Sequence, residues 1–133
     1  MQFTYPEDYP CNCPPAPFEE NPGFYYRFIK NDDKITSEDF DSPFKLGKRK
    51  DLVTKDPCGR RAISILSDLN DAKRILSLYR GLPRNILKLH LNGNHGIIHR
   101  VPKEGHAHFH WWIPKGVDPT TFATNEIRVP PEY

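Results

Sequence analysis

Apolar and aromatic residues fall in a few short stretches separated by polar loops. Phe24–Ile29 is rich in aromatic and β-branched side chains and predicts a strand, and Arg61–Leu66 predicts a second, buried strand. Residues 68–80 carry apolar side chains at helical spacing, begin with a capping aspartate and end at a glycine and a proline. The pattern therefore predicts a strand followed by an amphipathic helix.

The C-terminal half carries three further apolar stretches, at residues 85–91, 97–101 and 106–113. Asn92–Asn94 tolerates positive φ and predicts a hairpin turn between the first two. We therefore expect an α+β fold with a small, mostly antiparallel sheet, one main helix at about 68–80 and a C-terminal three-stranded meander. The strand–helix–strand order of residues 61–91 is also compatible with a parallel crossover.

The length of 133 residues favours a single core. Residues 1–23 hold six of the fourteen prolines and predict an extended arm with polyproline character. We expect one α+β domain at residues 24–113 and a proline-containing tail that wraps around it at residues 114–133.

Apolar runs, the N-terminal segment and the cysteine count indicate the cellular compartment of the protein. The longest apolar runs, at residues 62–66 and 109–113, are too short to cross a bilayer, so we expect no membrane partner. The N-terminal segment lacks the basic and apolar regions of a signal peptide. Three cysteines, an odd number, favour separate reduced thiols over a disulfide framework. Together these features predict a cytoplasmic protein.

The net charge of +2 hides an uneven distribution of charge. Residues 1–44 hold nine acidic and three basic side chains, whereas residues 45–103 hold fourteen basic and four acidic ones. A basic segment of this kind is typical of proteins that bind nucleic acid or nucleotides. Alternatively, the acidic N-terminal third folds back over the basic middle and neutralises it.

All six histidines lie between residues 90 and 110, and three of them alternate as His106, His108 and His110. Side chains alternate along a strand, so these three are expected on one face together with Trp112. His90 lies on a neighbouring predicted strand. Several imidazoles are thus expected on one sheet surface.

Two chemistries suit such a cluster, because imidazole exchanges protons near neutral pH and binds divalent metals. In the first, His108 and His110 hold zinc or manganese with His90, His99 or Glu104 as a third ligand. In the second, which needs no metal, two histidines act as acid and base while Arg100 or Lys88 stabilises negative charge. An exposed histidine face without chemistry is the third alternative. The residues expected to bind a substrate are Lys88, Arg60, Arg61, Trp112 and Arg27.

Two resemblances accompany these residues. Arg27 on the first strand and Ser64 on a later strand followed by a helix resemble mono-ADP-ribosyltransferases, which place an arginine and then a serine on strands that hold a nicotinamide dinucleotide. That family also needs a glutamate from a later strand, and here none of the glutamates after Ser64 lies in a predicted strand. The segments PCNCPP, YYRFIK with EDF, DPCGRRAISIL and HFHWW resemble a group of short bacterial proteins of uncharacterised activity.

Three functions follow as hypotheses. The first is a small nuclease or nucleotide-phosphoester enzyme that uses the histidine cluster, of the kind found in toxin or defence modules. The second is an ADP-ribosyltransferase-like enzyme that uses the dinucleotide. The third is a non-catalytic subunit or adaptor that meets a protein partner through its proline-rich arm.

Overall fold

The computed structural model describes residues 3–15, 23–30, 35–47, 56–78, 81, 84–92, 94–101 and 108–129. In chain order the elements are β1 (Gly23–Ile29), η1 (Ser37–Phe40), η2 (Gly59–Arg61), β2 (Ile63–Leu66), α2 (Leu69–Leu78), β3 (Asn85–Leu91), β4 (Ile97–Arg100), β5 (His108–Trp112), η4 (Pro119–Phe122) and β6 (Ala123–Arg128).

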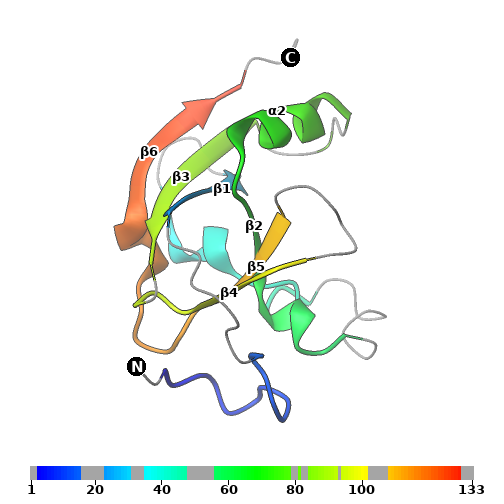
Figure 1. Cartoon of the computed structure of the whole chain (residues 1–133), viewed down its shortest axis with the longest axis vertical. Helices are drawn as coiled ribbons and strands as arrows, with labels where there is room; N and C mark the ends of the chain where they lie inside the picture. Colours follow the sequence, from blue (N-terminus) through cyan, green and yellow to red (C-terminus); the bar gives the residue numbers. More distant parts are fainter. Residues whose placement is uncertain are drawn as a thin grey trace.

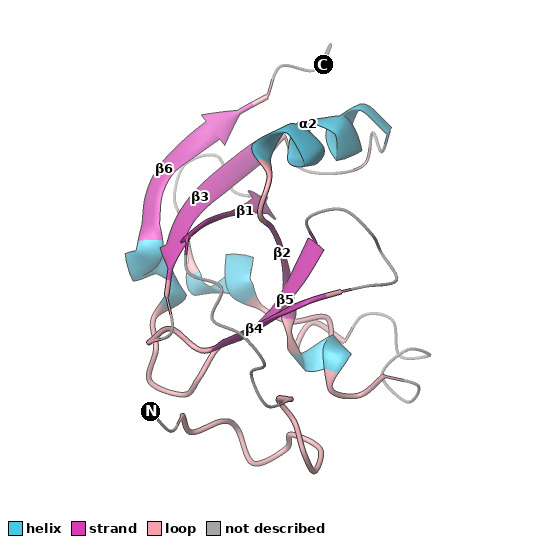
Figure 2. Ribbon diagram, in the orientation of Figure 1, coloured by secondary structure: helices cyan, strands magenta, loops and turns pink. Residues whose placement is uncertain are grey.

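The six strands form one antiparallel sheet in the order β4-β5-β2-β1-β3-β6, and α2 is the one main helix among the described residues, so the α+β prediction is confirmed. Figure 2 shows the helix packed against one end of the sheet. The strands β2 and β3 are both antiparallel to β1, which lies between them, so they run in the same direction. The segment β2–α2–β3 is therefore a parallel crossover that spans β1.

The sheet divides between β1 and β2. Their pairing consists of Tyr26 opposite Leu66, whereas β1 and β3 pair along their whole lengths. In Figure 1, β3 and β6 curve along one side of the molecule, and β2, β5 and β4 lie on the other. Two three-stranded halves thus meet at one point and diverge from it.

Strand alternation gives the sheet two different faces. The core face carries the larger hydrophobic cluster, centred on Ile65, Leu87 and the fully buried Trp111. The opposite face, here called the helix face, is covered by α2, whose Ala72 and Leu76 pack with Leu66 and Ile86. Helix α2 covers one end of the helix face, and its outward side remains polar, as its helical periodicity predicts.

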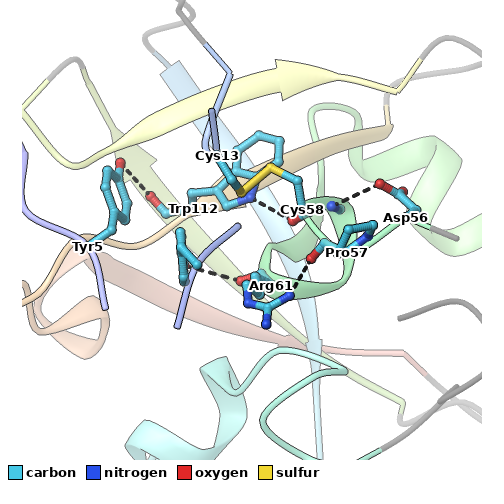
Figure 3. The surroundings of a disulfide bond; sticks show 9 residues. Tyr5, Cys13, Asp56, Pro57, Cys58, Arg61 and Trp112 are labelled. Carbon is cyan, nitrogen blue, oxygen red and sulfur yellow. Dashed lines mark hydrogen bonds between the residues drawn. A yellow bond between two sulfur atoms is a disulfide. The ribbon is translucent and has the colours of Figure 1, made fainter. Parts of the chain in front are cut away.

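The N-terminal arm lies against the domain and is joined to it by a disulfide between Cys13 and Cys58 (Figure 3). The prediction of three reduced thiols is therefore wrong, and Cys11 is the free, exposed cysteine. An odd number of cysteines does not exclude one bridge, and the 45-residue separation hid the pairing from sequence reasoning. Disulfides are typical of oxidising compartments, so the cytoplasmic location stays a prediction that this bridge disfavours.

Aromatic contacts hold the same arm in place. Tyr5 donates a hydrogen bond to the Trp112 carbonyl at 3.3 Å, and Tyr9 donates one to the Arg61 carbonyl at 3.4 Å. The rings of Tyr5 and Tyr9 stack with their centroids 5.4 Å apart. Burial raises the pKa of Tyr5 to about 12. The arm is thus part of the fold over residues 3–15.

Two expectations about the C-terminal half need correction. The meander is not formed, because β4 pairs with β5 at one edge of the sheet while β3 lies in the other half. Gly96 directs the chain there: its φ is +124° and a Cβ would lie 3.0 Å from the Trp111 indole nitrogen, so the backbone passes close over β5. The tail is not all coil either, since β6 pairs with β3.

Candidate functional site

A row of polar side chains crosses the helix face where α2 does not cover it. Within the sheet, His110 of β5 lies directly opposite Ser64 of β2 on one side and His99 of β4 on the other. Directly paired residues share a face, so three neighbouring strands present these side chains together. His108 lies on the same face two residues away, with its ring centroid 5.7 Å from that of His110. We call His99, His108, His110 and Ser64 the imidazole row.

The members of the imidazole row differ in their exposure to solvent. Ser64 is exposed, although its strand neighbours Ile63 and Ile65 are buried. His99, His108 and His110 are half-buried. The arrangement places hydroxyl and imidazole groups side by side, which suits proton transfer and hydrogen bonding to a polar substrate.

Arg27 lies where β1 and β2 diverge. Its Nε donates to the carbonyl of Asp39 at 2.8 Å, and a terminal nitrogen donates to the carbonyl of Ser64 at 2.8 Å. Burial lowers the pKa of Arg27 to about 10, and the charges of Asp39 and Asp41 offset part of that effect, so the guanidinium stays protonated at neutral pH. Arg27 therefore joins β1, β2 and η1 at the point where strand pairing ends.

Among the described residues, the predicted metal ligands His108, His110 and His90 do not lie together. His90 lies on β3, three strands away from the β5 that carries His108 and His110, which is about 14 Å at the usual strand spacing. Within the described part of the chain, no group of three or more histidine, cysteine, aspartate or glutamate side chains is placed to hold a metal ion. His106 and Glu104 lie outside the described residues.

Two further residues predicted for the site lie elsewhere. Arg100 pairs with Phe109 in the sheet and its guanidinium lies over that ring at 5.0 Å, on the core face and so opposite the imidazoles. Trp112 does share the histidine face, as expected, but it is 3% exposed. Its indole nitrogen donates to the Cys58 carbonyl at 2.9 Å (Figure 3). Trp112 is thus buried beside the disulfide and the N-terminal arm, and its ring is not available to stack on a base.

The basic residues predicted to bind substrate are dispersed. Lys88 lies on the helix face of β3, with its ammonium 4.2 Å from the centroid of the exposed Phe24 ring, which in turn stacks on His90 at 4.7 Å. Arg60 and Arg61 lie on η2. The guanidinium of Arg61 donates to the Pro57 carbonyl at 2.8 Å. Lys88 alone among these three shares a face with the imidazole row.

Sequence reasoning found the histidines but missed their partner strand. The ISIL pattern of β2 predicts that Ser64 faces opposite to Ile63 and Ile65, but not which strand lies beside it. The pairing of β2 with β5 is long-range, and the sequence carries no turn or spacing that reveals its register. The alternation of β1 indicated that Phe24 and the buried Tyr25 face opposite sides of the sheet. It did not indicate that Phe24 is exposed beside Lys88 and His90.

No protein-family model matches the chain, and neither the curated proteins nor the solved structures contain a match. None of the helices among the described residues has the length and apolar character needed to cross a bilayer.

Proposed function

We propose that the chain is an ADP-ribosyltransferase-like enzyme that cleaves a nicotinamide dinucleotide at the imidazole row. In this proposal Ser64 and His110 contact the substrate. Arg27 is a positioning residue that fixes β2 through the Ser64 carbonyl.

One observation carries the proposal: the arginine and serine that suggested the resemblance are joined by a hydrogen bond. Arg27 donates to the Ser64 carbonyl, and the side chain of Ser64 lies opposite that of His110. The resemblance places an arginine and then a serine on strands of one sheet and takes a glutamate from a later strand. Strands β1 and β2 are neighbours and carry the first two residues, and β5 lies beside β2.

Cleavage of the dinucleotide requires the protein to orient the substrate and to accept one proton. Cleavage of the bond between ribose C1′ and the nicotinamide nitrogen leaves both electrons on that nitrogen. The ribosyl carbon then accepts an electron pair from a nucleophile, water or an acceptor side chain, which loses a proton. Neutral His110 accepts that proton as a general base, and the Ser64 hydroxyl hydrogen-bonds the ribose.

The chain departs from the family pattern at the third residue. The expected glutamate is absent from the described residues of β5, where histidines alternate with Phe109 and Trp111. Glu126 lies on β6, which β1 and β3 separate from β2. An imidazole carries no negative charge to stabilise a cationic ribosyl intermediate, so a slow hydrolytic reaction fits the site better than rapid transfer.

The test is release of nicotinamide from the dinucleotide, measured by liquid chromatography, for the wild type and for His110→Ala and Ser64→Ala. Loss of a general base typically lowers the rate by about 10²- to 10⁴-fold, so His110→Ala should release nicotinamide at least about 10²-fold more slowly than the wild type. His90→Ala is the matched control, because His90 lies on the same face but on β3. Wild-type protein that neither binds the dinucleotide by calorimetry nor releases nicotinamide would contradict the proposal.

A second candidate, cleavage of RNA phosphoesters, is favoured by the His108–His110 pair. Two half-buried imidazoles on one face, with ring centroids 5.7 Å apart, suit an acid and a base acting together on a 2′-hydroxyl without a metal. This candidate predicts RNA cleavage that persists in chelator and is lost in His108→Ala. RNA left intact by the wild type would remove it.

The remaining hypotheses stay predictions. A role as a toxin or defence module follows from either chemistry. The adaptor hypothesis requires the proline-rich arm to meet a protein partner, and residues 3–15 of that arm pack against their own domain.

A further inference from the structure

A cavity of about 470 Å³ lies away from the imidazole row. Its floor is Ile63 of β2 and Trp111 of β5, which belong to the core face of the sheet. Ser64 and His110 follow or precede these residues and therefore point to the opposite face. A ligand in this cavity would be separated from the imidazole row by the thickness of the sheet.

The cavity lining combines aromatic, aliphatic and charged side chains. Phe40 of η1, Phe44 in the following turn and Tyr9 of the N-terminal arm join Trp111 as its aromatic members, and its charged members are Asp8, Asp41, Lys45 and Arg61. Aromatic and aliphatic walls with a few polar groups, enclosing some hundreds of cubic ångströms, are typical of small-molecule sites. The walls therefore suit a planar, apolar group.

Arg61 supplies a cation to the cavity. The guanidinium lies over the Phe44 ring, 3.8 Å from its centroid, and makes one hydrogen bond, to the Pro57 carbonyl. No carboxylate among the described residues forms an ion pair with it, whereas the other cation of the lining, Lys45, pairs with Asp41 at 3.1 Å. The Nε of Arg61 is buried, so the donors that remain for a ligand are those of its two terminal nitrogens beyond the one that Pro57 accepts. Such a planar fork matches the geometry of a carboxylate, which it can bind through two parallel hydrogen bonds.

We infer that this cavity binds a small aromatic carboxylate, with the acid at Arg61 and the ring against Phe40 and Trp111. The inference is independent of the proposed function, because it uses none of the side chains of the imidazole row.

The arm is a removable wall of the cavity. Pro6 and Tyr9 line it, and the Cys13–Cys58 disulfide holds the arm beside η2, which carries Arg61. Reduction frees residues 3–12 from this tether and leaves the hydrogen bonds of Thr4, Tyr5 and Tyr9 to hold the arm, of which that of Tyr9, the one beside Arg61, is long at 3.4 Å. Binding should therefore be weaker in the reduced protein.

The first experiment titrates 3-phenylpropanoate and its neutral amide into the oxidised full-length protein by calorimetry. Saturable one-to-one binding of the acid, at least tenfold tighter than that of the amide, is expected. Equal affinities, or no saturable binding of the acid, would overturn the inference. The comparison uses the wild-type protein and therefore does not depend on the folding of a variant.

Variants then locate the site. Arg61→Gln should weaken binding of the acid at least tenfold, and the matched Arg60→Gln, on the same η2 turn, should leave it within twofold. Ile113→Trp keeps Arg61 and fills the cavity, so it should abolish binding. Unchanged binding in Ile113→Trp, or equal losses in the two arginine variants, would place the ligand elsewhere.

A pair of cysteine variants tests whether the N-terminal arm forms a wall of the cavity. Cys13→Ser should weaken binding of the acid severalfold, and Cys11→Ser, which leaves the bridge intact, should not. Wild-type affinity in Cys13→Ser would overturn the role of the arm.

Discussion

The disulfide between Cys13 and Cys58 should account for a large share of the stability of this domain. The bridge closes a loop of 45 residues, which contains β1 and η1. In the chain-entropy model, closing a loop of that length removes enough freedom from the unfolded chain to stabilise the fold by about 4 kcal/mol. Small domains are stable by only about 5–15 kcal/mol, so its loss is severe.

The assay is urea unfolding of Cys13→Ser followed by tryptophan fluorescence, because Trp112 donates its indole N–H to the Cys58 carbonyl. With a slope of about 1–3 kcal/mol per molar urea, the loss of about 4 kcal/mol should lower the midpoint by roughly 1.3–4 M. Cys11→Ser is the control and should lie within about 0.5 kcal/mol of the wild type, since exposed substitutions have small effects. Equal midpoints for Cys13→Ser and the wild type would refute the reasoning.

Three further predictions concern single residues. Partial burial and the nearby His90 lower the pKa of His95, so its NMR titration should fall below the ordinary value of about 6.5. Because the fold disfavours protonated His95, the free energy of unfolding should decrease as pH falls from about 6.5 to that lowered value, and His95→Gln should remove this dependence. Arg27→Met removes two charge-assisted hydrogen bonds to backbone carbonyls, so chemical unfolding should show a loss of about 2–5 kcal/mol; a loss below about 1 kcal/mol would contradict the joint between β1 and β2. Gly96→Ala adds a Cβ against β5 at positive φ, and calorimetry should show a melting temperature several degrees lower, whereas Gly116→Ala, strained in φ but open, should cost less.

Local patterns of the sequence predicted the local elements well. The apolar stretch of β1 and the unit of β2 and α2 lie within two residues of the predicted bounds, because periodicity and capping act over a few residues. These are features that short-range interactions determine.

Long-range features were not readable in the same way. The expected hairpin between β3 and β4 failed because the turn at Asn92–Asn94 leads to a different half of the sheet, where Gly96 packs on β5. The alternation in β5 correctly separated His110 from Trp111, yet it could not show that the arm buries Trp112. Pairing partners and covering segments depend on contacts between residues far apart in the chain, which periodicity does not encode.

The candidate site was predicted in the same partial way. The histidines of β5 were identified from residue type and spacing, and the arginine of β1 from the resemblance to mono-ADP-ribosyltransferases. Their relation through Ser64 required the register of β2 with β5, and the separation of His90 from His108 required the strand order.

Calorimetric titration of a nicotinamide dinucleotide into the wild type, His110→Ala and His90→Ala, with nicotinamide release followed on the same samples, tests the central claim most directly. The account predicts that the wild type and His90→Ala bind the dinucleotide and release nicotinamide, and that His110→Ala binds it without measurable release. Equal release from His110→Ala and the wild type would contradict it.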